Sequence, residues 1–487
     1  MDHFLFHNTN NPAHRVPFKE ALLAGQAPEY GLYTPARKDI PLLESGLIRE
    51  MKGMPYAEIA YHVLHPFLNQ IPPSKIRELL DDAYRPDVID TKVQHVKGKT
   101  NIMWLTGPPT HSFKDYASRF YARTTNHFLV EERLWRLVLN ATSGDTGGAI
   151  SDALYGLENV AVFVVYPQGK VSEGQRRQMT TLRGNIYAVE LNADFNVCQD
   201  LTKVLLNDKE FFHKVFGDIN AATSANSISV GRLLPQMVYP FYAHSRIADG
   251  IEPMIVSIPS GNFGDMMGTL LAMQRGLPVS RIVCGVNENK GFVDFLERGV
   301  YGVGSTKLSP SSAMNVPHPS NLARVFDHYG GHMHDERDRQ GKVIREGVIT
   351  RMPDLFAMRK DIFSVSIGNE AHFDTMQRVH KDHGIILDPH GAVGWRALEL
   401  LPGFNHDQLA AVYETADPGK FPDEVHRAIG ITPPLPVAME RQRALEERIY
   451  QIRSEPDRIG DGKTRLSAAQ IAEAKALIQD TFSARQA

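Results

Sequence analysis

The sequence is poor in cysteine and has no long apolar run. Its 487 residues include only two cysteines, Cys198 and Cys284, and no CxxC pair. A disulfide scaffold or a zinc ribbon is therefore not expected, and a reducing compartment is favoured. No apolar run reaches about 18 residues, and the opening MDHFLFHNTNN lacks the basic and apolar regions of a signal peptide. These absences predict a cytoplasmic protein without a membrane segment.

An excess of positive charge is also missing. The formal net charge is −3 at pH 7, which gives no basic footprint for nucleic acid. Hydrophobic residues make up 42% of the chain, enough for a large core, and the length predicts two or three domains. The composition agrees with an ordinary soluble enzyme. It leaves open whether the protein is a monomer or a homodimer.

Strand-like and helix-like segments alternate along most of the chain. The segment VAVFVVY is apolar throughout and rich in β-branched residues, as expected for a buried parallel strand. Such alternation predicts an α/β fold with a parallel, helix-covered sheet. The predicted strands are 136–140, 160–166, 254–258, 281–286 and 409–414, and the predicted helices are 147–156 and 265–275.

The composition of the sequence changes on both sides of this alternating region. Residues 1–100 combine Pro-rich loops with helices such as 56–68, which predicts a smaller N-terminal subdomain. Residues 101–430 form the alternating catalytic region, expected to consist of two subdomains. Residues 431–487 are charged, with predicted helices at 439–452 and 466–482, and are expected to wrap the surface or an interface.

One lysine and three turns carry the chemistry. Lys114 stands in FKD at the end of 103–115, and the turns are TSGDTG (142–147), PSGNFG (259–264) and ETADPGKFP (414–422). A lone lysine is usually a surface charge, and Ser, Asp and Thr often only cap helices. Together, however, an amine and several helix starts that bind anions are what pyridoxal phosphate requires. Ligands collect at the carboxyl ends of parallel strands, where all three turns fall.

These segments, in this order, resemble the threonine synthase family of fold-type-II pyridoxal phosphate enzymes. Further stretches are similar to that family: APEYGLYTP (27–35), YPQGKVSEGQRRQMTT (166–181), NSISVGRLLPQ (226–236) and LDPHGAVG (387–394). The resemblance covers roughly residues 25–430. It implies a fold like that of the tryptophan synthase β subunit and a reaction that converts O-phospho-L-homoserine and water to L-threonine and phosphate.

The resemblance also implies a role for each site residue. Lys114 binds the cofactor and is catalytic, Asp145 lies near the ring oxygen, and Thr415 bonds the ring nitrogen. The cofactor phosphate is held by Ser260, Gly261, Asn262, Phe263 and Gly264, and the substrate carboxylate by Ser143, Gly144, Thr146 and Gly147. For the substrate phosphate, the guanidinium of Arg232 offers a bidentate fork. Asn226 and Ser227, close upstream, complete the expected substrate site.

Five positions depart from the family pattern: Thr106, Lys290, Asn315, Gly391 and Asp417. Gly391 replaces a threonine, and Asp417 replaces a histidine. Because some of these positions are expected near the substrate, two alternatives remain open. One is a paralogue that acts on a related amino acid, and the other is a non-catalytic protein that binds pyridoxal phosphate. Lys114 argues against the second.

A group of histidines near residue 330 resembles a metal site at first sight. His328, His332, His334 and Asp335 lie close in sequence, but Gly330 and Gly331 interrupt any helix between them. We therefore expect a solvated loop and no metal. The charged segment 336–351 is expected at the surface.

Overall fold

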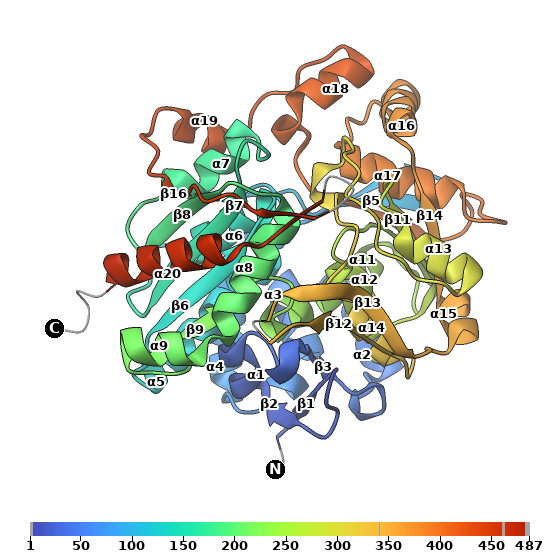
Figure 1. Cartoon of the computed structure of the whole chain (residues 1–487). Helices are drawn as coiled ribbons and strands as arrows, with labels where there is room; N and C mark the ends of the chain where they lie inside the picture. The colour runs from blue at the N-terminus through green and yellow to red at the C-terminus, as the bar shows by residue number, and fades with distance from the viewer. Residues whose placement is uncertain (1–2, 340, 460–462, 483–487) are drawn as a thin grey trace.

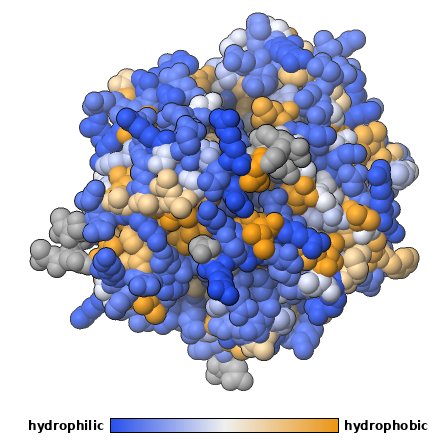
Figure 2. All heavy atoms as spheres, viewed as in Figure 1, coloured by the Kyte–Doolittle hydropathy of each residue, from blue (hydrophilic) through white to orange (hydrophobic). Residues whose placement is uncertain are grey.

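The computed structural model describes residues 3–339, 341–459 and 463–482. Two sheets lie side by side, and the N-terminal segments, blue in Figure 1, pack at the base of both. The face shown in Figure 2 is mainly hydrophilic, with scattered apolar residues. Within the described residues, no helix is both long and apolar enough to cross a membrane.

The larger sheet has six strands in the order β14-β11-β10-β15-β5-β4. Neighbouring strands are parallel except β4 and β5, which form an antiparallel pair. Along β10, Val256 and Ile258 face one apolar cluster and Ile255 faces another, so both faces need a helical cover. The strands are β4 (Lys92–Lys97), β5 (Thr100–Trp104), β10 (Met254–Pro259), β11 (Val279–Val286), β14 (Ile362–Ser366) and β15 (Ala410–Glu414).

The smaller sheet has five strands, all parallel, in the order β16-β8-β7-β6-β9. Val138 of β6 shares a cluster with Ile150 of the next helix, whereas Leu137 and Leu139 face Leu201 and Leu205 on the other side. The strands are β6 (Arg136–Ala141), β7 (Val160–Pro167), β8 (Ile186–Leu191), β9 (Ala222–Ser224) and β16 (Tyr450–Ile452).

Helices cover both sheets and fill the space between them. Those near the larger sheet are α12 (Gly264–Gln274), α16 (Asn369–His383), α17 (Pro389–Glu399) and α18 (Pro422–Ile429). Those near the smaller sheet are α5 (Lys114–Glu131), α6 (Asp145–Leu154), α7 (Glu173–Thr180), α8 (Phe195–Asn207) and α9 (Lys209–Phe216). Further helices are α10 (Val230–Leu233), α11 (Val238–Ile247), α13 (Gly291–Arg298), α14 (Leu322–His328) and α15 (Leu355–Asp361).

The strands and helices predicted in the alternating region are confirmed, with ends that differ by a few residues. The prediction succeeds because buried parallel strands are continuously apolar and end at glycine-rich turns. The predicted parallel α/β fold is therefore correct.

The N-terminal region packs into the common core. Phe18 contacts Phe120 of α5 with ring centroids 6.3 Å apart. Strand β4 precedes residue 100 but belongs to the larger sheet. The domain boundaries given by the sequence stay a prediction. The elements of this region are β1 (Leu5–Asn8), β2 (Arg15–Pro17), β3 (Tyr33–Pro35), α1 (Phe18–Ala24), α2 (Ser45–Glu50), α3 (Tyr56–Leu64) and α4 (Pro73–Ala83).

The C-terminal region is less helical than predicted. Helix α19 covers only Val437–Arg443, and Tyr450–Ile452 pairs with β8 as an edge strand, so a helix over 439–452 is wrong. Strands β17 (Asp457–Ile459) and β18 (Lys463–Arg465) follow, and the last helix is confirmed as α20 (Ala468–Phe482). A strand of three residues is too short to show the alternation of apolar and polar residues that would reveal it in the sequence. Residues 450–452 form a strand because they pair with β8.

The histidine segment is also different from the expectation. His332, His334 and Asp335 lie on β12 (His332–Arg337), which pairs with β13 (Val343–Arg351) as an antiparallel hairpin. The prediction of a solvated loop is therefore wrong, because the backbone N–H and C=O groups of β12, which follows the glycines, pair with those of β13. Most of β13 is exposed or half-buried, as expected for a surface segment.

Candidate active site

Four strand ends from the two sheets meet at one place. β5, β10 and β15 of the larger sheet and β6 of the smaller sheet each lead into a turn at their carboxyl ends. These turns surround a pocket with about 900 Å³ of empty space, part of it open to solvent. A pocket at the carboxyl ends of parallel strands is where such folds bind small molecules.

The pocket brings together nearly all of the residues that the sequence predicts. Gly144 and Gly147, which belong to the TSGDTG turn, are the exceptions, because they do not line the pocket. The N–H of Gly147 donates a hydrogen bond to the hydroxyl oxygen of Thr142, and a Cβ on Gly144 would collide with the side chain of Gln175. The predicted residues in the lining are Lys114, Ser143, Asp145, Thr146, Asn226, Ser227, Arg232, Ser260, Gly261, Asn262, Phe263, Gly264 and Thr415.

Lys114 opens helix α5 at the base of the pocket. Asp115 fixes this helix start, since its carboxylate accepts hydrogen bonds from the backbone N–H and the hydroxyl of Thr110, at 2.9 and 2.6 Å. Burial lowers the pKa of the Lys114 amine; Asp145 opposes this effect, and Lys420 and Arg232 add to it. An amine that loses its proton easily is the form that attacks an aldehyde.

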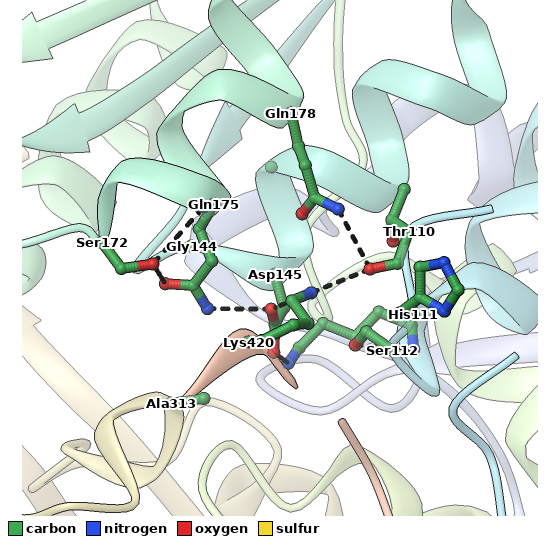
Figure 3. Close-up of polar contacts among 12 residues, drawn as sticks. Thr110, His111, Ser112, Gly144, Asp145, Ser172, Gln175, Gln178, Ala313 and Lys420 are labelled. Atoms are coloured by element: carbon green, nitrogen blue, oxygen red, sulfur yellow. Dashed lines mark hydrogen bonds and ion pairs between the residues drawn. The ribbon is translucent and has the colours of Figure 1, made fainter. Parts of the chain in front are cut away.

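Asp145, at the start of α6, is the centre of a buried polar network (Figure 3). Its Oδ1 lies 2.6 Å from Lys420 Nζ and accepts a hydrogen bond from Gln175 at 2.8 Å. Its Oδ2 lies 3.6 Å from Lys114 Nζ. Burial alone would raise the pKa of this carboxyl, but the two ammonium groups bring it well below its usual range.

The turn before α12 is built for an anion. No described side chain caps the start of this helix, so its first backbone N–H groups are free to bind a phosphate. Phe263 has a φ of 60°, which turns the chain sharply into the helix. A Cβ on Gly261 would lie 2.8 Å from the carbonyl oxygen of Ala313, so only glycine fits that close approach.

Asp265, in the first turn of α12, is a carboxyl group beside this anion site. Both of its oxygens are buried without a hydrogen-bond partner among the described residues. Burial raises its pKa well above the usual range, which favours the uncharged form of the group. The uncharged form of this acid would not repel a phosphate at the neighbouring turn.

Thr415 follows β15 and closes the opposite wall of the pocket. Its carbonyl oxygen accepts a hydrogen bond from the N–H of Phe113 at 2.9 Å, which joins it to the residue before Lys114. Its hydroxyl makes no hydrogen bond to the described side chains. An amine, a phosphate-binding helix start and a free hydroxyl therefore line one pocket, and these residues fit pyridoxal phosphate.

Arg232 is not a surface residue. It is 4% exposed and lines the pocket; one guanidinium nitrogen donates to the carbonyl of Ala225 at 2.9 Å. Its Nε has no partner in the described part of the chain. Burial lowers its pKa to about 10, so it stays charged at neutral pH. Asn226 differs, because both ends of its amide bond the main chain of Ala141, at 2.8 and 2.6 Å.

The five departures from the family pattern stand outside the lining of this pocket. Lys290 pairs with Asp294 at 3.4 Å, and Asn315 accepts a hydrogen bond from Asn287 at 2.9 Å. Asp417 accepts a hydrogen bond from the N–H of Gly419 at 2.8 Å. The cofactor machinery is therefore not altered at these positions.

Several pocket or network residues were missed by sequence reasoning. Gln236, Asp265 and His390 line the pocket, and Lys420 lies directly behind it. Lys420 belongs to the ETADPGKFP turn, so a charged residue between a glycine and an aromatic residue was the available signal. Among the described residues, no group of three or more His, Cys, Asp or Glu side chains is arranged to bind a metal.

Comparisons with known proteins agree with this geometry. Residues 5–84 match the family model "Threonine synthase N terminus", and residues 104–410 match "Pyridoxal-phosphate dependent enzyme". The threonine synthase of Methylobacillus glycogenes is 32% identical over 91% of this chain and 95% of its own length. The chain belongs to the threonine synthase family. The enzyme of Escherichia coli, another member, is 32% identical over 88% of this chain and 92% of its own.

Solved structures of the threonine synthase family have the same fold. The pyridoxal phosphate-bound threonine synthase of Brucella melitensis superposes with a TM-score of 0.83 at 27% identity, covering 98% of this chain and 99% of its own. The yeast enzyme gives 0.81 at 25% identity and covers 99% of both chains. This family member is thus a fold-type-II enzyme that depends on pyridoxal phosphate.

Proposed function

We propose that the protein catalyses the threonine synthase reaction in the cytoplasm, converting O-phospho-L-homoserine and water to L-threonine and phosphate as a carbon–oxygen lyase. The observation that supports this proposal most directly is the presence of two separate anion sites in one pocket. One is the uncapped start of α12, and the other is the guanidinium of Arg232. A phosphorylated substrate and a phosphorylated cofactor need one site each.

Each wall of the pocket has a proposed role. The Ser260–Gly264 turn binds the cofactor phosphate, and Thr415 bonds the ring nitrogen. Ser143 and Thr146, at the start of α6, bind the substrate carboxylate, where backbone N–H groups favour an anion. Gly144 and Gly147 shape that turn, and Asn226 and Ser227 position the substrate end near Arg232.

Lys114 performs the proton transfers. When bound, pyridoxal phosphate supplies the electron sink that stabilises negative charge beside the substrate amino group. Lys114 Nζ takes the proton from Cα of the substrate, and a second proton then leaves Cβ as the bond between Cγ and the phosphate oxygen breaks. Arg232 stabilises the negative charge of the departing phosphate. One proton returns to Cγ and the other leaves with the phosphate, while water supplies the hydroxyl group of Cβ and the proton of Cα.

The test is to supply O-phospho-L-homoserine to the protein loaded with pyridoxal phosphate and to measure phosphate and threonine together. We expect equal amounts of the two products. Lys114→Ala should lose both, whereas Lys38→Ala, at an exposed position, should keep both. Phosphate with an oxo acid in place of threonine would indicate elimination only, and no phosphate would favour a paralogue with another substrate.

A further inference from the structure

A second lysine is buried beside the active-site pocket and does not line it. Lys420 ends the short helical turn Pro418–Lys420 after β15, and its side chain is 0% exposed. Its ammonium lies 2.6 Å from Asp145 Oδ1 and donates to the carbonyl oxygen of Thr110 at 2.9 Å, as Figure 3 shows. A fully buried ammonium is costly unless it is paired in this way.

Asp145 therefore has two cationic neighbours, one on each oxygen. Lys420 makes the closer contact, on the same oxygen that accepts from Gln175, whereas Lys114 is 3.6 Å from the other oxygen. Lys420 does not line the pocket, and Lys114 does. The carboxylate is thus anchored by the lysine behind it and only partly neutralises the lysine in front of it.

We propose that Lys420 is a positioning residue that holds Asp145 as an anion and limits its attraction for Lys114, so that the Lys114 amine loses its proton readily. The inference rests on the proposed function in one respect, that Lys114 is the residue that binds pyridoxal phosphate. Lys420 would thus belong to the active site without contacting the cofactor or the substrate.

The surrounding charges support this assignment. Burial is the main cause that lowers the pKa of Lys114; Asp145 raises it, and both Lys420 and Arg232 lower it. Without Lys420, the full negative charge of Asp145 would act on Lys114. The other titratable groups near Lys420 are Asp115, His111 and Asp417.

The experiment follows the uptake of pyridoxal phosphate by the apo-protein at different pH values, measured by absorbance. The pH midpoint of the uptake rate reports the ionisation of Lys114. Lys420→Met should raise this midpoint by about one pH unit or more, because Asp145 then acts on Lys114 alone. Asp145→Asn should move it in the opposite direction. Lys420→Arg, which keeps the positive charge, should stay close to wild type.

Opposite shifts separate positioning from a merely structural role. Loss of a structural contact would lower thermal stability in both variants without moving their midpoints apart. The double variant Lys420→Met/Asp145→Asn removes both members of the closest buried ion pair, so it remains testable where a single variant does not fold. Its midpoint should lie below wild type and above Asp145→Asn. If Lys420→Met and Asp145→Asn had equal midpoints, or shifted in the same direction from wild type, only this inference would be overturned. A wild-type protein that takes up no cofactor would overturn the proposed function as well.

Discussion

The carboxyl group of Glu414 occupies the space that a side chain on Gly391 would need. A Cβ built on Gly391 would collide with Oε2 of Glu414. Glu414 is fully buried, and its Oε1 accepts a hydrogen bond from the N–H of Asp388 at 2.5 Å. Glycine therefore stands at position 391, where the family has threonine, because the carboxyl group of Glu414 leaves no room for a side chain.

This relationship predicts strong coupling between the two positions. Gly391→Thr should destabilise the protein by about 1–3 kcal/mol or more, because the added atoms have no room beside Glu414. Combined with Glu414→Ala, the same substitution should cost less than the sum of the two single changes, by about 0.5–3 kcal/mol. Urea unfolding of the four proteins measures the coupling.

A matched control exists at Gly368, where an added Cβ meets nothing within 4 Å and φ is −72°. Gly368→Thr should leave stability nearly unchanged, since threonine is a good residue at a helix start. Additive costs in the 391/414 cycle would show that the two side chains do not compete for one space.

The strands and turns of this fold were predictable, and the pairings between them were not. The 160–166 strand and the PSGNFG turn carry their signal in consecutive residues, as continuous apolar character or as glycine. Lys420 and Asp145 stand 275 positions apart (420 − 145) and meet only because their strands end at the same place. No local pattern contains such a contact.

The same limit applies to the residues whose chemistry is changed by burial. Asp265 resembles an ordinary acidic residue in the first turn of a helix, which the sequence pattern favours. Its oxygens lack partners among the described residues, and burial raises its pKa; this burial depends on packing between elements that are distant in the sequence. Sequence reasoning therefore found most of the residues that line the pocket and missed the buried contacts that change their chemistry.

Asp265 gives a prediction about pH and stability. Its pKa in the folded protein is raised by burial, so its contribution to stability is present below the pKa of the unfolded chain and is lost as pH rises. Asp265→Asn removes this loss. In the apo-protein, the free energy of unfolding of the variant relative to wild type should rise by about 1.4 kcal/mol per pH unit above pH ~4. Parallel pH profiles from urea unfolding would contradict the buried neutral acid.

Thr415→Asp should change the products more than the cofactor content. A carboxylate beside the ring nitrogen would stabilise the protonated form of that nitrogen and so strengthen electron withdrawal by the ring. Stronger withdrawal favours elimination to an oxo acid over threonine formation. The ratio of oxo acid to threonine measures this change, and Thr415→Ser, which keeps the hydroxyl, is the control. An unchanged ratio in the aspartate variant would show that Thr415 does not contact the ring nitrogen.

Arg232→Ala should separate the two phosphate sites. Its guanidinium lies in the pocket, and its Nε has no hydrogen-bond partner among the described residues. Because the cofactor phosphate is assigned to the start of α12, only substrate binding and phosphate departure should suffer. A charge-assisted contact contributes roughly 1.5–3 kcal/mol, which corresponds to a fall in kcat/KM of about ten- to a hundredfold or more. Arg232→Lys keeps the charge but loses the fork, and should fall between the alanine variant and wild type. Titration with pyridoxal phosphate should give the same affinity for all three proteins. A variant that loses cofactor affinity while keeping its KM for O-phospho-L-homoserine would mean that the two anion sites are assigned in the wrong order.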